Sequence, residues 1–128
     1  MKSAPKLNAE TRELVLLLAF VYLENNRPEK AAALLDALQA LSTADGRARC
    51  TLALSQLRSG KPALALSTLD ALAMSGPPNA VFHLIRAECL NALNRHDEAA
   101  AAMRAYVALR KAESVNNAAT TAPGAPGV

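Results

Sequence analysis

The chain has 128 residues, of which 52% are hydrophobic but only 3% aromatic, and its formal net charge at pH 7 is +3. This length predicts one domain with a modest core, and the abundance of alanine and leucine predicts helices. Basic residues are interspersed with acidic ones, so the sequence offers neither the basic stripe nor the interleaved aromatic residues typical of a nucleic-acid-binding protein.

We expect residues 1–11 to be a flexible N-terminus, and a run of ten apolar residues follows at 14–23. This run is about half as long as a helix that spans a bilayer. Charged residues precede it and no small-residue cleavage site follows it, which argues against a secretory signal peptide. We therefore expect a soluble, cytoplasmic protein.

A period of thirty-four residues organises most of the chain. Residues of one kind recur at this spacing in five columns: Ala19, Ala53 and Ala87; Asn26, Gly60 and Asn94; Ala31, Ala65 and Ala99; Leu35, Leu69 and Met103; Leu38, Leu72 and Tyr106. The alanines predict close approach of paired helices. The asparagines and glycine predict a residue in the left-handed conformation at the end of the first of the two helices in each repeat. Two helices in thirty-four residues are typical of the tetratricopeptide repeat.

The period predicts an all-α domain of three tandem repeats, at 12–45, 46–79 and 80–113. Six antiparallel helices would then form a right-handed superhelix, and three repeats are about the minimum that bury a continuous core. Pro77 matches the terminal proline of the repeat and Asn79 can cap the next helix, whereas Thr43 and Lys111 depart from the proline column. Residues 114–128 lack an apolar period and end in Ala, Pro and Gly, so we expect a disordered tail.

Helical spacing divides the apolar run into three stripes. The first, which includes Leu18 and Ala19, is predicted to pack inside its repeat. The second faces the concave groove. The third faces the side on which an earlier repeat would stack, and we expect it to be exposed. This outer stripe consists of Leu14, Leu17 and Val21.

The same groove positions can be assigned in all three first helices. They predict a surface that is apolar in the middle and polar at its far side and rim. Either these rows pack together as core, or several large side chains stay exposed and form a binding surface. The predicted groove residues are Leu16, Phe20, Leu23, Arg47, Cys50, Leu54, Leu57, Val81, Leu84, Glu88 and Asn91.

The sequence offers little for catalysis, metal binding or a cofactor. Cys50 and Cys89 lack metal-ligand spacing, so they are interpreted as small buried side chains in a reducing compartment. His83 and His96 lie apart in the sequence, and no glycine-rich phosphate loop is present. We therefore expect no catalytic residues, no bound metal and no cofactor, and we expect that the protein is not an enzyme.

Residues 31–57, "AAALLDALQALSTADGRARCTLALSQL", resemble the central part of the YscY-type (SctY) type III secretion chaperones. The segment "ETRELVLLLAFVYLENNRPEKA" is similar to the first repeat of that family. The resemblance implies a small bacterial chaperone that binds an early-exported YscX-type protein and helps to bring it to the SctV-type export-gate membrane protein. It implies neither nucleic-acid binding nor membrane insertion. The alternatives are a repeat chaperone for a needle or translocator subunit, a scaffold protein that is not a chaperone, and a self-associating structural protein.

Overall fold

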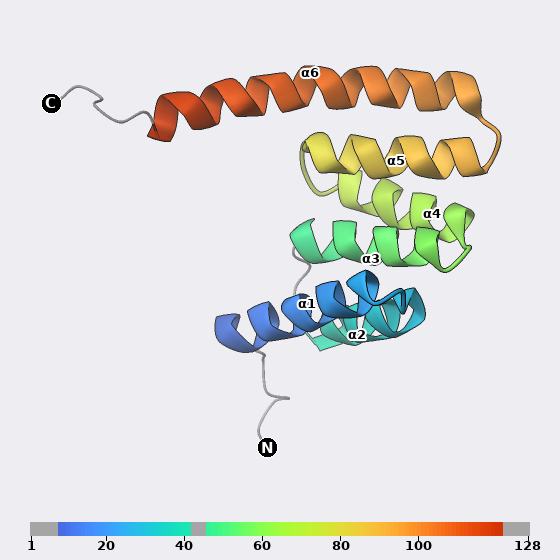
Figure 1. Ribbon diagram of the computed structural model, residues 1–128, viewed down its shortest axis with the longest axis vertical. Helices are drawn as coiled ribbons and strands as arrows, with labels where there is room; N and C mark the ends of the chain where they lie inside the picture. Colours follow the sequence, from blue (N-terminus) through green and yellow to red (C-terminus); the bar gives the residue numbers. More distant parts are fainter. Residues whose placement is uncertain (1–7, 42–45, 122–128) are drawn as a thin grey trace, which may run out of the picture. The chain divides into compact units, whose positions relative to one another are not determined.

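The computed structural model describes residues 8–41 and 46–121, and every regular element in these ranges is a helix. The helices are α1 (Ala9–Glu24), α2 (Pro28–Leu41), α3 (Gly46–Arg58), α4 (Pro62–Ala73), α5 (Ala80–Ala92) and α6 (His96–Thr121) (Figure 1). The predicted all-α fold is thereby confirmed. No helix within the described ranges has the length and hydrophobicity needed to cross a membrane.

The chain divides into two compact units. Met1–Pro77 contains α1 to α4, and Pro78–Val128 contains α5 and α6. In the first unit α1 packs on α2, α2 on α3, and α3 on α4; in the second unit α5 packs on α6. Each of the three pairs α1–α2, α3–α4 and α5–α6 is a helical hairpin, as expected for one repeat.

The ends of the first helices agree with the predicted turn column. Asn26, Gly60 and Asn94 have φ angles of 59°, 81° and 61°, which confirms the left-handed residue in each repeat. Asparagine tolerates this conformation better than most residues, and glycine adopts it without a steric penalty. Asn79 also acts as predicted, because its side chain accepts a hydrogen bond of 3.0 Å from the backbone N–H of Phe82 at the start of α5.

The six alanines of the two alanine columns are all at most 2% exposed. Their burial agrees with the prediction that small residues stand where the helices of each pair meet. In the first unit a contiguous apolar core joins three helices. Leu35 and Leu38 of α2 lie in one cluster with Ala48 and Leu52 of α3, so α3 covers one face of α2. Each buried leucine in this cluster contributes about 1.5–3 kcal/mol.

Two predicted boundaries were wrong. Helix α1 begins at Ala9, so residues 9–11 are helical; the side chain of Asn8 caps this end by accepting a 2.7 Å hydrogen bond from the N–H of Thr11. Helix α6 runs to Thr121, so residues 114–121 belong to a helix and not to a disordered tail. An existing helix adds one hydrogen bond per residue without a new nucleus, and it needs no apolar period to continue. Residues 1–7, 42–45 with Thr43, and 122–128 lie outside the described residues.

Candidate partner-binding surface

Three of the predicted groove residues in the first unit belong to the core. Leu16 and Leu23 lie in the apolar cluster with α2 and α3, and Cys50 is also buried. The correction has a physical reason: these side chains sit where α1 and α3 meet their neighbouring helices, and burial there removes apolar surface from water. Part of the predicted groove is therefore core, which was one of the two alternatives.

Three other apolar residues of the predicted groove in the first unit remain accessible. Phe20 on α1 is 41% exposed, and Leu54 and Leu57 on α3 are partly exposed. Phe20 and Leu54 occupy equivalent positions in consecutive repeats, on two helices that contact each other. Leu54 also packs against the apolar cluster, so one side of its side chain is buried. We refer to Phe20, Leu54 and Leu57 as the inner row.

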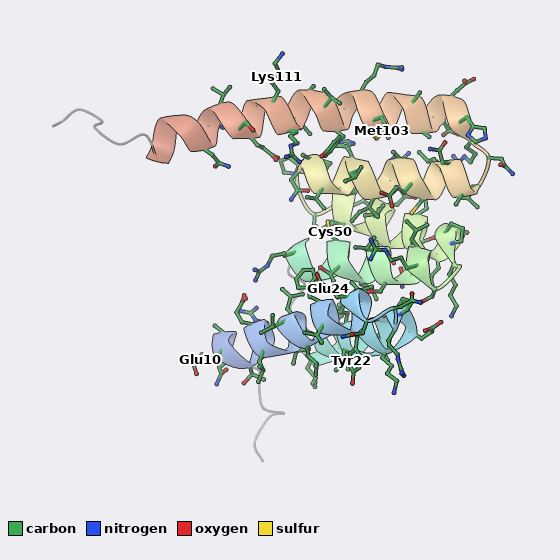
Figure 2. The ribbon with its side chains drawn as sticks, viewed as in Figure 1. Glu10, Tyr22, Glu24, Cys50, Met103 and Lys111 are labelled. Atoms are coloured by element: carbon green, nitrogen blue, oxygen red, sulfur yellow. The ribbon has the colours of Figure 1, made fainter. Side chains whose placement is uncertain are left out.

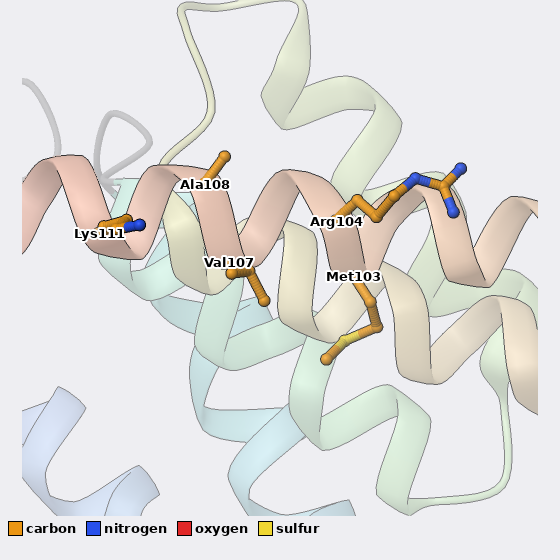
Figure 3. Close-up of a pocket in the computed structure, with 5 residues that line it drawn as sticks. All are labelled: Met103, Arg104, Val107, Ala108 and Lys111. Carbon is orange, nitrogen blue, oxygen red and sulfur yellow. The ribbon is translucent and has the colours of Figure 1, made fainter.

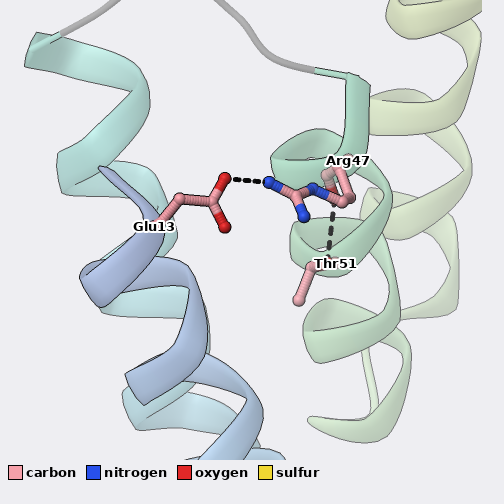
Figure 4. Close-up of polar contacts among 3 residues, drawn as sticks. All are labelled: Glu13, Arg47 and Thr51. Atoms are coloured by element: carbon pink, nitrogen blue, oxygen red, sulfur yellow. Dashed lines mark hydrogen bonds and ion pairs between the residues drawn. The ribbon is translucent and has the colours of Figure 1, made fainter. Parts of the chain in front are cut away.

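An ion pair joins the same two helices (Figure 4). Arg47 donates a hydrogen bond from its guanidinium to the carboxylate of Glu13, and the two residues are one repeat apart in the sequence. Both side chains are more than half exposed, so the pair contributes about 0–1 kcal/mol. Arg47 is a predicted groove residue, whereas Glu13 was missed. The signal that identifies Glu13 is an opposite charge at the repeat spacing on the preceding first helix.

The remaining predicted groove residues lie on α5 in the second unit. Val81 is exposed, Leu84 is half-buried, and Glu88 and Asn91 are exposed. The Oδ1 atom of Asn91 lies 2.9 Å from the Nδ1 atom of His96, so this polar end of α5 is tied to the start of α6. The second unit thus has its own row along α5. That the rows of the two units form one groove stays a prediction.

The outer stripe of α1 is exposed to solvent: Leu14 is 66% and Leu17 59% exposed, and Val21 is exposed as well. Figure 2 shows the side chains around this helix, between Glu10 near its start and Glu24 at its end. Leu18 is 42% exposed, although the sequence placed it inside the repeat. Its equivalent Leu52 is buried because α2 lies against α3, and no described helix covers the corresponding side of α1.

A second apolar surface, which sequence reasoning missed, lies on α6. Met103, Arg104, Val107, Ala108 and Lys111 line a shallow open depression along one side of the helix (Figure 3). The sequence feature that could have identified this surface is the column of Leu35, Leu69 and Met103, whose last member lies in the last predicted repeat. Met103 is 37% exposed, whereas its equivalents in α2 and α4 are fully buried leucines.

The described residues contain no group of three or more His, Cys, Asp or Glu side chains that could hold a metal ion. Cys50 and Cys89 are free thiols, and burial raises the pKa of both, to about 11 for Cys89. Both thiols are therefore protonated at neutral pH. Burial, helped by the nearby charge of Arg86, lowers the pKa of His83.

Comparison with known proteins identifies the family. Models of the tetratricopeptide repeat match residues 50–122, which is more than half of the chain, and residues 13–37. The chain therefore belongs to the tetratricopeptide repeat family. No curated protein sequence matches it significantly.

A solved structure shares the fold. The crystal structure of PcrH in complex with the chaperone binding region of PopB is similar to this chain with a TM-score of 0.76 and 24% sequence identity. The match covers 85% of this chain and 88% of PcrH. At this identity the likeness shows that the two chains have the same fold.

Proposed function

We propose that this protein is a chaperone of a bacterial type III secretion system and that its inner row holds a segment of a secreted protein. The inner row carries the proposal, because Phe20, Leu54 and Leu57 keep apolar surface accessible on two adjacent first helices. PcrH, which has the same fold, was crystallised with the chaperone binding region of PopB. That complex supports the idea that a fold of this kind binds one region of another protein.

The client that we propose is a small early-exported protein of the YscX type, which the chaperone helps to bring to the SctV-type export gate. This part rests on the resemblance of residues 31–57 to the YscY-type chaperones. The chaperone would act in the bacterial cytoplasm and be recruited to the export apparatus at the inner membrane. It would act by binding alone, without enzymatic activity or a cofactor.

The proposed mode of binding is an amphipathic helix in an apolar groove. A secreted protein must stay unfolded or partly helical before export, and its apolar side chains would otherwise aggregate. Each leucine or phenylalanine that becomes buried at the inner row contributes about 1.5–3 kcal/mol before the cost of ordering the client. The Glu13–Arg47 pair places opposite charges beside the apolar row, on the same two helices, where they can orient the client's polar face.

Co-expression with each small protein encoded beside the gene tests the proposal. We expect one of them to copurify at a defined stoichiometry and to be secreted while the chaperone stays in the cell. Phe20→Asp should abolish copurification without unfolding the free chain, since Phe20 is already partly in water. The matched control is Leu64→Asp, because Leu64 is an exposed leucine on the second helix of its repeat, outside the inner row.

The same experiment separates the alternatives. A needle or translocator subunit as the copurifying client would change the class of client and leave the chaperone role in place. A scaffold protein would stay in a stable complex whose other members are not secreted. Loss of copurification in the Leu64→Asp control as well as in Phe20→Asp would show that the inner row has no particular role.

A further inference from the structure

The first unit contains one complete contact between consecutive repeats, the packing of α3 on α2. On α3, Ala48 and Leu52 lie in the apolar cluster with α2, and Thr51 and Ser55 share their helix face by the i, i+3, i+4, i+7 spacing; all four residues are buried. The hydroxyl of Thr51 donates to the carbonyl of Arg47, and that of Ser55 to the carbonyl of Thr51, both at 2.8 Å. Because each hydroxyl is satisfied within α3, the face can be buried without polar partners on α2.

One repeat earlier, the same four positions form the outer face of α1. Three of these positions carry larger apolar side chains than in α3, the fourth is leucine in both helices, and all four residues are exposed. The four residues of this face are Leu14, Leu17, Leu18 and Val21. The outer face of α1 is thus one half of a repeat-to-repeat contact that has no counterpart among the described residues of its own unit.

The other half of the contact is open on α6. In α2 the contact uses Leu35 and Leu38, which are buried beside α3. Two repeats later the equivalent residues are Met103, which is exposed, and Tyr106, which is half-buried. Met103 lies in the depression of Figure 3 with Val107 and the basic residues Arg104 and Lys111. We call this surface the outer face of α6.

We propose that the outer face of α1 in one copy of the chain packs on the outer face of α6 in a second copy, so that copies associate head to tail. The contact would repeat between copies what α3 does on α2 within one copy. It does not depend on the proposed chaperone function.

The charges of the two faces support a second copy as the occupant. Glu10 stands one helical turn before Leu14, in line with the outer face of α1, whereas Lys111 stands one turn after Val107 on α6. Helix α3 starts only five positions after the last residue of α2, so the two packed helices run antiparallel. In the same arrangement between copies, the start of α1 lies toward the later part of α6, which brings Glu10 toward Lys111.

The proposed contact joins two different faces, and this determines the kind of assembly that it can form. The two faces differ, so each pair of copies leaves one outer face of each kind free, and association continues to an open chain or closes into a ring. A contact of one helix face on another is at the small end of protein interfaces, below about 1,200 Å² in total. Association should therefore be reversible and depend on concentration.

Two variants and their mixture test the proposal by sedimentation velocity. Variant one carries Leu17→Glu and Val21→Glu on α1, and variant two carries Met103→Glu and Val107→Glu on α6. Wild-type protein should form species larger than dimers as its concentration rises, and each variant alone should stay monomeric. An equimolar mixture should form a heterodimer and stop there, because each variant retains the face that the other has lost. Leu64→Glu, on an exposed leucine outside both faces, should associate as the wild type does.

Circular dichroism checks that the variants fold, which we expect because all four positions are exposed. If either variant unfolds, the single changes Glu10→Lys and Lys111→Glu replace it: each should weaken association a few-fold, and their mixture should restore it in part. A monomeric wild type at all concentrations overturns the proposal. So does a mixture without heterodimer, or a dimer that survives the changes on α6, which would indicate contact between two α1 faces.

Discussion

Leu52→Ala and Leu18→Ala make the same chemical change at the same position of consecutive repeats, so their comparison isolates the effect of a covering helix. Leu52 is 2% exposed and lies in the apolar cluster with α2. Truncation of a leucine in such a site removes its transfer free energy and leaves a cavity, at a cost of about 2–5 kcal/mol. Leu18 is 42% exposed, so water fills the space and only part of the transfer free energy is lost, at a cost of about 1 kcal/mol.

Urea denaturation followed by circular dichroism measures both free energies of unfolding, at a protein concentration at which the chain is monomeric. With a slope of about 2 kcal/mol per molar urea, Leu52→Ala should lower the midpoint by about 1–2.5 M, and Leu18→Ala should lower it by about 0.5 M. Equal losses at the two positions would refute the reasoning, because they would show that the face of α1 is covered within one chain. A small loss for Leu52→Ala would refute its place in the core.

Gly60→Ala should lower the free energy of unfolding by about 1 kcal/mol, since a φ of 81° is strained for any residue with a Cβ, and urea denaturation measures the loss. Glu113→Ala should cost about 1 kcal/mol in the same assay, because the Glu113 carboxylate accepts a 3.1 Å hydrogen bond from the first N–H of α5. Cys50 and Cys89 should react slowly with Ellman's reagent at pH 8 in the folded chain and rapidly in denaturant, because burial raises the pKa of both thiols. The pKa of His83 is lowered in the folded chain, so the unfolded chain binds the proton more tightly. The contribution of His83 to the free energy of unfolding should be fully present above the ordinary histidine pKa of 6.5 and should be lost as the pH falls below it. Urea midpoints measured between pH 7.5 and 5 test this.

Each of these predictions has a matched control. Gly60→Asn should be nearly neutral, because asparagine holds this position in the other two repeats. Glu113→Gln keeps an acceptor and should lose less than the alanine variant. His83→Gln should flatten the part of the pH dependence that comes from this residue. A thiol that reacts at full speed in the folded chain would show that it is not buried.

The thirty-four-residue period was enough to predict the helical pairs, the buried alanine columns and the left-handed turns. These features depend on residues within one repeat or on its immediate turn, so Ala19 and Ala53, or Asn26 and Gly60, have the same surroundings. Local chemistry also identified Asn79 as a helix cap.

The period could not predict which equivalent positions are covered. Leu18 and Leu52, or Met103 and Leu35, are equivalent in sequence, yet their exposure differs because only one member of each pair has a helix packed over it. The groove assignment of Leu16 failed for a related reason. Its position indicates a direction from the helix axis, whereas its burial depends on how closely the neighbouring helices approach.

The most direct test of the proposed function is site-specific photo-crosslinking in bacteria that carry an active type III secretion system. A photoreactive benzoylphenylalanine replaces Phe20 in one strain and Leu64 in another, and the crosslinked proteins are identified by mass spectrometry. The proposal predicts that position 20 crosslinks to one secreted protein of that system and that position 64 does not. Crosslinking of the same protein from both positions, or none from position 20 in cells that make the client, would contradict it.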